Sequence, residues 1–379
     1  MPLNPLPLNP ASQPVGIWRW ADGIASVPAD CRRTLGEGNT PLVRSRQIGA
    51  RFGLPNLYFK LESCNPTGSY KDRFAAVAVS HVLAAGQKRC IATSSGNAGA
   101  ALAAACAVAR VECRIAIVEG APADKIQQMA AYGADLFTVP GFGRDAEVTE
   151  QVLHHIQRLG SAPEAAVQIT AYRWSPKGMS GVQTISYELA EECQKPAWQQ
   201  PLDHVFVPAG GGGLTLAVAR GFSELVSRGQ IPTSPCIECV QPEGNNTMAG
   251  ALRDGLERGG DVGVCTSKIS GLQVPHLVDA NEVIQACRAS GGSGHIVSDE
   301  AVWEAQALLA REEGIFSEPA GAVALAGALK ARNEGRIDPD AAVACLVTGS
   351  GFKDKASVER MVEGNRCQTI ELVDLAASD

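Results

Sequence analysis

A lysine that follows a cluster of turn residues is the first candidate for chemistry in this sequence of 379 residues. The stretch Asn65-Pro66-Thr67-Gly68-Ser69-Tyr70-Lys71-Asp72-Arg73 comes after an apolar run, and a helical pattern of apolar residues begins at Phe74. Lys71 therefore stands at the start of a helix, where the positive end of the helix dipole disfavours a charged ammonium group. A neutral amine can attack a carbonyl and form a Schiff base, for example with the aldehyde of pyridoxal phosphate. Taken alone, the pattern is equally compatible with a surface lysine that pairs with Asp72.

A second candidate region is Thr93-Ser94-Ser95-Gly96-Asn97-Ala98-Gly99, which lies between a short apolar run and an alanine-rich helical segment. Small hydroxyl residues, glycine and asparagine at a strand-to-helix turn present backbone N–H groups and a helix N-terminus to an anion. An α-carboxylate or a phosphate would suit this place. The alternative is that Ser95 and Asn97 only cap the helix.

The third candidate is the run of glycines from Gly210 to Gly213, which follows the apolar segment Val205-Phe206-Val207-Pro208. Residues without a Cβ let backbone amides approach a phosphate closely, and the dipole of the next helix adds to the attraction. A nucleoside triphosphate is disfavoured because no Lys-Ser or Lys-Thr pair follows the glycines. A dinucleotide fits poorly, since Thr215 occupies the third glycine position and residues 230–235 carry no acidic partner for a ribose. A small monophosphate, such as that of pyridoxal phosphate, remains.

The fourth region is Ala344-Cys345-Leu346-Val347-Thr348-Gly349-Ser350-Gly351-Phe352-Lys353-Asp354, again an apolar run that ends in small and hydroxyl residues. Ligands of parallel α/β sheets sit outside the carboxyl ends of the strands, so we expect this region to join the other three. A neutral hydroxyl such as that of Thr348 can hydrogen-bond a pyridine nitrogen without fixing it as a cation, which favours elimination and replacement reactions. We expect Lys353 and Asp354 to form a structural pair.

Alternating strands and helices must position these four regions. Such alternation predicts an α/β protein in which parallel sheets are covered on both faces. We place a small mobile domain at 85–175, because the candidate regions fall on both sides of it. The large domain then comprises 17–84 and 176–379, and residues 1–16 form an N-terminal arm.

The periodicity of apolar residues gives the expected bounds of these elements. A first strand is expected from Leu57 onward, and the further expected strands are 89–93, 114–118, 135–139, 166–170, 204–208, 236–240 and 343–347. The expected helices are 73–85, 97–110, 123–132, 145–159, 178–194, 245–257, 279–289, 298–313 and 319–332.

The composition is that of an ordinary soluble globular protein, with 45% apolar and 19% charged residues. A net charge of −7 argues against nucleic acid or an anionic membrane as the main partner. Twelve cysteines, mostly inside apolar runs, indicate a reducing compartment, and with no signal or transit peptide we expect a cytoplasmic protein. Cys236 and Cys239 form a lone C-x-x-C without a second ligand pair, so no metal is expected.

Among the histidines, His154 and His155 are expected on a solvated helix face, whereas His276 and His295 could line the site mouth.

Taken together, these residues resemble the pyridoxal-phosphate (PLP) dependent enzymes of the tryptophan synthase β-subunit type, and among them the threonine synthases most closely. The resemblance extends from about Gly16 to Lys355 and implies a two-domain, three-layer parallel-sheet fold (fold type II) and a homodimer. It rests on five segments that occur in one order: Leu35 to Leu42, Lys60 to Arg73, Ser94 to Asn97, Glu318-Pro319-Ala320 and Thr348 to Asp354.

The resemblance also implies how the cofactor is held. Lys71 would form the Schiff base with PLP, the internal aldimine, and would later move protons. Asn97 would hydrogen-bond the 3-oxygen of the cofactor, and Gly210 to Gly213 would hold its phosphate. Thr348 would face the pyridine nitrogen.

For the substrate, the resemblance implies that Ser94, Ser95 and Gly96 receive the α-carboxylate of an amino acid. Arg173 lies where threonine synthases carry an arginine for the substrate phosphate, and Lys177 could assist it. An exposed loop arginine is the alternative for Arg173.

The expected activity is a lyase reaction that converts O-phosphohomoserine and water to L-threonine and phosphate by γ-elimination and β-addition. Two departures from threonine synthases keep a sibling activity open: Ala98-Gly99 replaces Thr-Ala, and the glycine loop is more like that of threonine dehydratases and cysteine synthases. The alternatives are a threonine or serine dehydratase, or a β-replacement enzyme that uses O-phosphoserine. A non-catalytic PLP-fold protein and a nucleotide-binding protein are the readings from other functional classes.

Overall fold

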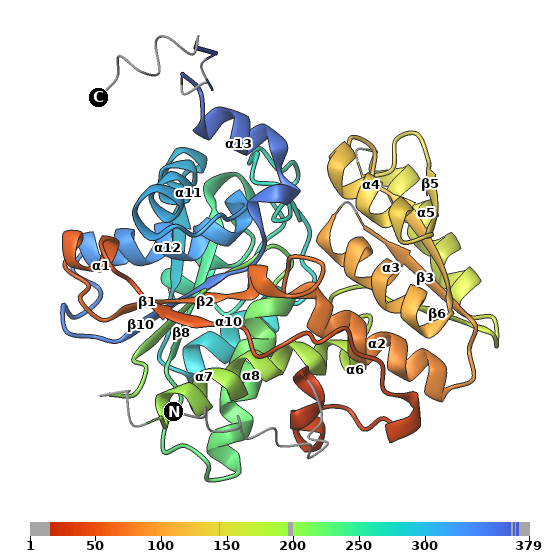
Figure 1. Ribbon diagram of the computed structural model, residues 1–379, viewed down its shortest axis with the longest axis horizontal. Helices are drawn as coiled ribbons and strands as arrows, with labels where there is room; N and C mark the ends of the chain where they lie inside the picture. Colours follow the sequence, from red (N-terminus) through yellow and green to blue (C-terminus); the bar gives the residue numbers. More distant parts are fainter. Residues whose placement is uncertain are drawn as a thin grey trace, which may run out of the picture.

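Two sheets with helices on both faces organise the chain, as the computed structural model shows (Figure 1). The structure describes residues 16–94, 96–143, 145–195, 200–364, 367 and 369–370. Residues 1–15 of the expected N-terminal arm, and Ser95, lie outside the described residues. Within the described part of the chain, no helix combines the length and apolar character needed to cross a bilayer.

The larger sheet has six strands in the order β1-β2-β10-β7-β8-β9. All neighbouring strands in it are parallel except β1, which runs antiparallel to β2. The strands are β1 (Leu42–Arg44), β2 (Leu57–Leu61), β7 (His204–Pro208), β8 (Cys236–Pro242), β9 (Gly294–Val297) and β10 (Val343–Val347).

The smaller sheet has four parallel strands in the order β5-β4-β3-β6. They are β3 (Arg89–Thr93), β4 (Glu112–Ile117), β5 (Asp135–Thr138) and β6 (Ala165–Val167). This sheet is drawn in yellow and orange at the right of Figure 1, beside α3, α4 and α5.

Helices cover both faces of each sheet. They are α1 (Ile48–Arg51), α2 (Lys71–Ala84), α3 (Asn97–Ala109), α4 (Ala123–Ala131), α5 (Ala146–Gly160), α6 (Pro176–Ser180), α7 (Thr184–Cys193), α8 (Gly213–Ser227), α9 (Ala249–Arg253), α10 (Ala280–Ala289), α11 (Asp299–Glu313), α12 (Pro319–Asn333) and α13 (Lys355–Met361). On the large sheet, α11 and α12 lie on one face and α7, α8 and α10 on the other (Figure 1).

The buried apolar residues alternate between the two faces of β10. Ala344 and Leu346 join the core under α8 and α10, whereas Val343, Cys345 and Val347 join the core under α11 and α12. A strand whose successive side chains are buried on opposite faces reads as a continuous apolar run, which is why the sequence pattern locates such strands well.

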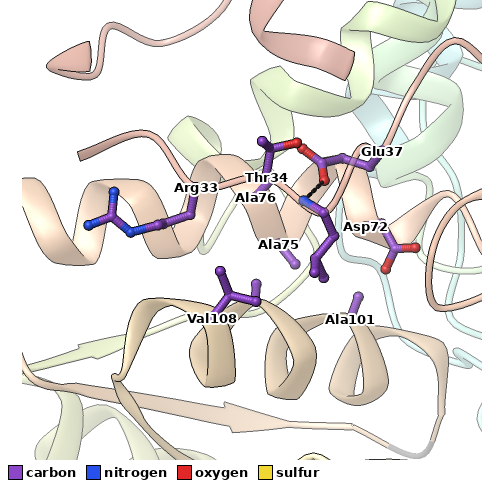
Figure 2. A pocket seen from close by; sticks show the side chains of 10 residues that line it. Arg33, Thr34, Glu37, Asp72, Ala75, Ala76, Ala101 and Val108 are labelled. Carbon is purple, nitrogen blue, oxygen red and sulfur yellow. Dashed lines mark hydrogen bonds between the residues drawn. The ribbon is translucent and has the colours of Figure 1, made fainter. Parts of the chain in front are cut away.

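The helices α2 and α3 connect the two sheets by packing against each other. Figure 2 shows the small hollow that remains between these helices and the segment 33–37. Alanines of both helices line it, including Ala75, Ala76 and Ala101, and small side chains of this kind let two helix backbones approach closely. The hollow therefore belongs to the packing of the two helices.

The strands 89–93, 204–208 and 343–347 agree with their expected bounds, and the α/β class is confirmed. The single helix expected over 178–194 was wrong, because this segment forms α6, a 3₁₀ turn and α7. At Gly181 a Cβ would lie 2.2 Å from the Arg73 carbonyl oxygen, so the chain approaches α2 too closely for a straight regular helix. Strand β9 was missed because its four residues are too short for a clear pattern.

Two expectations about single residues were also wrong. His295 is buried on β9, with its Nε2 2.8 Å from Glu238 Oε2, so it does not line the mouth of the site. Lys353 does not pair with Asp354: its Nζ donates to Gln128 Oε1 at 2.7 Å, while Asp354 caps α13. His154 and His155 are exposed on α5, as expected.

A neutral cluster of buried charges fixes the start of α2. Arg73 is fully buried and forms ion pairs with Glu62 at 2.7 Å and Glu188 at 2.6 Å. Lys60 is also buried and pairs with Glu188 at 2.7 Å. Burial alone would lower the pKa of Arg73, but the carboxylates of Glu188 and Glu62 raise it overall. Two cations and two carboxylates therefore compensate one another inside the protein.

We predict that Arg73→Met lowers the free energy of unfolding by about 3–5 kcal/mol, because it leaves two buried carboxylates with one cation between them. Urea unfolding followed by circular dichroism measures the change. Arg89→Met is the matched control, since Arg89 forms an exposed pair with Glu112 and should leave the unfolding midpoint nearly unchanged. Equal destabilisation by the two substitutions would contradict the assigned role of the buried cluster.

Candidate active site

Lys71 is the first residue of α2 and its side chain is half-buried. The Lys71 Nζ donates to Thr170 Oγ1 at 2.8 Å, across an interval of about a hundred residues in the chain. The Asp72 carboxylate is engaged elsewhere, because it accepts from Thr67 N at 2.7 Å and Thr67 Oγ1 at 2.5 Å. Among the described contacts of Lys71 and Asp72, no ion pair joins the two side chains.

The glycine run connects β7 to α8 and lies next to Thr170. At Gly213, a Cβ would lie 3.2 Å from the Thr170 carbonyl oxygen. Lys71 and the glycine run therefore contact the hydroxyl and the carbonyl of the same residue. Gly212 has a φ of +97°, a conformation that only glycine adopts at low cost, and it forms the N-cap of α8.

Asp279 ties the glycine run to the segment that carries Arg173. Its backbone N–H donates to Gly211 O at 3.0 Å. Its buried carboxylate accepts from the backbone N–H groups of Tyr172 at 2.8 Å and Arg173 at 3.1 Å. Burial raises the pKa of this carboxyl group, although the two N–H donors oppose the shift. The sequence motif search did not single out Asp279, because its partners are backbone groups distant in the chain.

Thr348 lies beside the lysine at the carboxyl end of β10. Its carbonyl oxygen accepts from Tyr70 N at 3.1 Å, and Ser69 forms a β-bridge with Gly349. Thr348 is buried, and its neighbour Gly349 touches Glu318 so closely that a Cβ would lie 2.1 Å from Glu318 Oε1. The fourth region therefore joins the first, as expected from the carboxyl ends of parallel strands.

The turn between β3 and α3 reaches the same place through Glu318. Asn97 Nδ2 donates to Glu318 Oε1 at 2.6 Å. Lys125, from α4 of the small sheet, is buried and pairs with Glu318 Oε2 at 3.3 Å. Its Nζ also donates to Ser270 Oγ at 3.0 Å, and its side chain passes close to Gly96. A buried carboxylate thus holds two groups of the small sheet against the large one.

Ser94 shapes this turn from inside. Its Oγ accepts from Gly96 N at 3.0 Å and Gly99 N at 2.9 Å, so its hydroxyl caps α3. Ser95 lies outside the described residues.

Arg173 and Lys177 occupy different surroundings. Arg173 is exposed, with its guanidinium over the Trp174 ring at 5.5 Å, on the segment held by Asp279. Lys177 is exposed too, and its charge acts on His81, near the far end of α2 from Lys71. The structure therefore brings Arg173, but not Lys177, to a segment that is tied to the glycine run.

A second buried lysine lies near this junction. Lys353 follows Thr348 in the chain and donates to Gln128 of α4. Burial lowers the pKa of Lys353 to about 8, although the carboxylates of Glu318 and Asp72 act in the opposite direction.

Sequence reasoning missed the roles of Thr170, Glu318 and Lys125. Glu318 belongs to the segment Glu318-Pro319-Ala320, but the sequence assigned it no role. Lys125 lies in the first turn of a helix and belongs to none of the candidate regions. Thr170 was placed inside a strand expected over 166–170, but β6 ends at Val167 and leaves the threonine in the loop that faces Lys71. Its only sequence signal was a hydroxyl residue just beyond an apolar run.

The residues present fit pyridoxal phosphate. Buried polar atoms of this region without a hydrogen-bond partner among the described residues include Ser69 Oγ, Asn97 Oδ1 and Thr215 Oγ1. The glycine run offers backbone amides at the start of a 15-residue helix, as a phosphate requires. Lys71 supplies an amine close to that run.

We predict that Gly212→Ala raises the dissociation constant of pyridoxal phosphate by roughly tenfold, because an alanine there costs about 1–2 kcal/mol of backbone strain. Its Cβ would also lie 2.8 Å from Val283 Cγ2, which moves the start of α8. Equilibrium dialysis followed by absorbance of the retained cofactor measures the affinity.

Gly229→Ala is the matched control, since Gly229 also has a positive φ of +67° but faces open space and lies beyond the C-terminus of α8. It should leave cofactor affinity unchanged. An equal loss of affinity in both variants would show that general destabilisation, not the phosphate loop, is being measured.

Comparison with known proteins agrees with this geometry. Residues 33–349 match the family described as pyridoxal-phosphate dependent enzyme. The chain is 34% identical over 353 residues to a threonine synthase of Methanocaldococcus jannaschii, which covers 92% of this chain and 83% of that relative.

Solved structures of the same fold are similar as well. The processed form of threonine deaminase isoform 2 from Solanum lycopersicum has a TM-score of 0.69 at 22% identity, covering 86% of this chain and 82% of the other. Maize serine racemase has a TM-score of 0.68 at 25% identity, covering 86% of this chain and 92% of the other. The two sheets thus form the tryptophan synthase β-subunit type of fold, known as fold type II. With a family match over most of its length and a relative that shares a third of its residues, this chain belongs to the pyridoxal-phosphate dependent enzymes, as a lyase similar to the threonine synthases.

Proposed function

We propose that this enzyme converts O-phosphohomoserine and water to L-threonine and phosphate. The observation that carries the proposal is the contact of Lys71 Nζ with Thr170 Oγ1 at 2.8 Å, on a residue whose carbonyl borders the glycine run. Thr170 therefore lies between the amine of Lys71 and the glycine run, to which we assign the phosphate of the cofactor. The similarity to threonine synthases supports the choice of substrate.

The cofactor-binding residues divide the work. Lys71 would hold the aldehyde carbon, the amides of Gly210 to Gly213 would hold the phosphate, and the Thr348 hydroxyl would face the ring nitrogen. Asn97, whose side chain is oriented by Glu318, would face the 3-oxygen. When bound, pyridoxal phosphate supplies the electron withdrawal that makes the α-proton of an amino acid acidic.

Lys71 is the residue that moves protons. Its free amine removes the α-proton of the substrate and then a β-proton, so that the phosphate can depart from Cγ. Thr170 accepts a hydrogen bond from this amine and so directs it between the two positions. A hydroxyl serves better here than a carboxylate, which would hold the amine in its charged form.

The substrate carboxylate is received by the turn from Ser94 to Asn97 at the start of α3. Ser94 holds this turn in shape through its two hydrogen bonds. Lys125 adds positive charge beside Gly96. An anion at a helix N-terminus with a buried cation nearby is well stabilised.

The substrate phosphate is assigned to Arg173. Asp279 holds the backbone of Arg173 and the glycine run in one arrangement, which keeps the segment that carries this guanidinium next to the run. A guanidinium offers paired donors to a phosphate, which Lys177 could not replace from its position beside His81.

A second candidate is a dehydratase of threonine or serine, or a β-replacement enzyme that uses O-phosphoserine. The specific observation in its favour is the first turn of α3, where Ala98 offers no hydroxyl to a leaving phosphate. A smaller substrate without a γ-phosphate would not need that hydroxyl.

The test is a product assay in which the holoenzyme receives O-phosphohomoserine, O-phosphoserine, threonine and serine separately. We predict release of phosphate and threonine in equal amounts from O-phosphohomoserine, and no turnover by Lys71→Ala.

Arg173→Gln should lower kcat/KM for O-phosphohomoserine by about 10–100-fold, since a charged hydrogen bond to the leaving group is lost.

Arg89→Gln is the control, because Arg89 is an exposed arginine at the start of β3 and should not affect turnover. A keto acid formed from threonine or serine at a rate that ignores Arg173→Gln would overturn the proposal in favour of the dehydratase.

A further inference from the structure

Three side chains with metal-binding atoms lie together at the amino-terminal ends of β7 and β8, whereas Lys71 lies near the carboxyl ends of the strands of the large sheet. They are His204, Cys236 and Glu238, and their ligand atoms all lie within 4.8 Å of one another. His204 Nδ1 is 2.9 Å from Glu238 Oε1. We propose that these three residues form a binding site for a zinc ion.

The sheet itself brings the three residues together. His204 and Cys236 are register partners on the neighbouring parallel strands β7 and β8. Glu238 stands two residues further along β8, so it points to the same face as Cys236. Ligands placed on paired strands are held more rigidly than ligands on loops.

The chemistry of the three ligands suits zinc. An imidazole nitrogen, a thiolate and a carboxylate oxygen are the donors that Zn²⁺ takes in proteins, and a water can complete four-coordinate geometry. The thiolate disfavours magnesium and calcium, which prefer oxygen donors. The Glu238 carboxylate supplies negative charge for a dication.

The carboxylate is already oriented by a surrounding shell. Glu238 Oε2 accepts from Ser293 N at 2.8 Å and lies 2.8 Å from His295 Nε2. Such contacts fix the direction of a ligating carboxylate and leave Oε1 for the metal. His295 is therefore a positioning residue.

The burial of the three residues allows metal entry. Glu238 is 5% exposed, whereas His204 and Cys236, the first residues of β7 and β8, are half-buried. Zinc would form three bonds to the protein and one to water. The Cys236 thiol would lose its proton to solvent, and His204 would carry its remaining proton on Nε2.

The C-x-x-C pattern does not supply this site. Cys239 is fully buried and joins the core under α8 and α10, whereas its neighbour Val240 joins the core under α11 and α12. Cys239 therefore faces away from Cys236. The proposed site uses Cys236 of the motif together with His204 and Glu238.

The test uses the untagged holoenzyme, stripped of metal with a chelator and then dialysed against zinc chloride. We expect about one zinc ion per chain by mass spectrometry of the metal content. Cys236→Ser and His204→Gln should each weaken zinc binding by more than about 100-fold, as measured by competition with a chromophoric chelator. Tetrahedral cobalt bands at wavelengths beyond the cofactor absorption should appear in wild type and be lost in both variants.

Cys193→Ser is the matched control, because it removes a half-exposed thiol from the end of α7. It should bind zinc as the wild type does, and retained cofactor absorbance checks that each variant is folded. Zinc uptake that is equal in all four proteins, or absent from the wild type, would overturn the proposal. Either outcome is independent of the substrate assay, since the site lies away from Lys71.

Discussion

The burial of Arg73 between two carboxylates is the constraint on which the rest of the arrangement depends. A guanidinium cannot give up its proton in a protein, so once it is buried it must keep its partners. Those partners come from different elements: Glu62 follows β2, and Glu188 lies on α7. Because Arg73 is two residues from Lys71, the same ion pairs that lock these elements together also set the direction of the lysine. When Arg73 is in place, the backbone of the first turn of α2, which carries Lys71, is in place too.

Around this fixed point, the active site is assembled by backbone groups and short side chains. Tyr70 N bonds to the Thr348 carbonyl, and Lys71 bonds to Thr170 beside the glycine run. The small sheet is attached in two ways that differ physically. Packing of α2 on α3 is apolar and close, whereas the contacts made to Glu318 and by Lys353 are polar. The junction of the two sheets therefore combines an apolar helix pair with a buried ion pair, that of Lys125 and Glu318.

Much of this could be predicted because the relevant signals are local. Buried strands such as β7 and β10 are continuous apolar runs, and the carboxyl ends of β2, β10 and β7 lie side by side in the large sheet, so three of the four turns are expected to meet. The fourth turn follows β3 of the small sheet and reaches the others through Glu318. The residues that complete the site left no such signal. Thr170 depends on where β6 stops, and Asp279 acts through backbone N–H groups of a distant loop. Glu318 and Lys125 acquire their meaning only when the two sheets close on each other. The pairing of His295 with Glu238 likewise depends on β9, which is too short to recognise.

The central claim is that Lys71, and not one of the buried lysines, is the amine that holds the cofactor. Treating the holoenzyme with sodium borohydride fixes the cofactor permanently to that amine, and peptide mass spectrometry then locates it. We predict one pyridoxyl group per chain on the peptide that contains Lys71. A label on Lys125 or Lys353, the two buried lysines at the junction of the sheets, would contradict it.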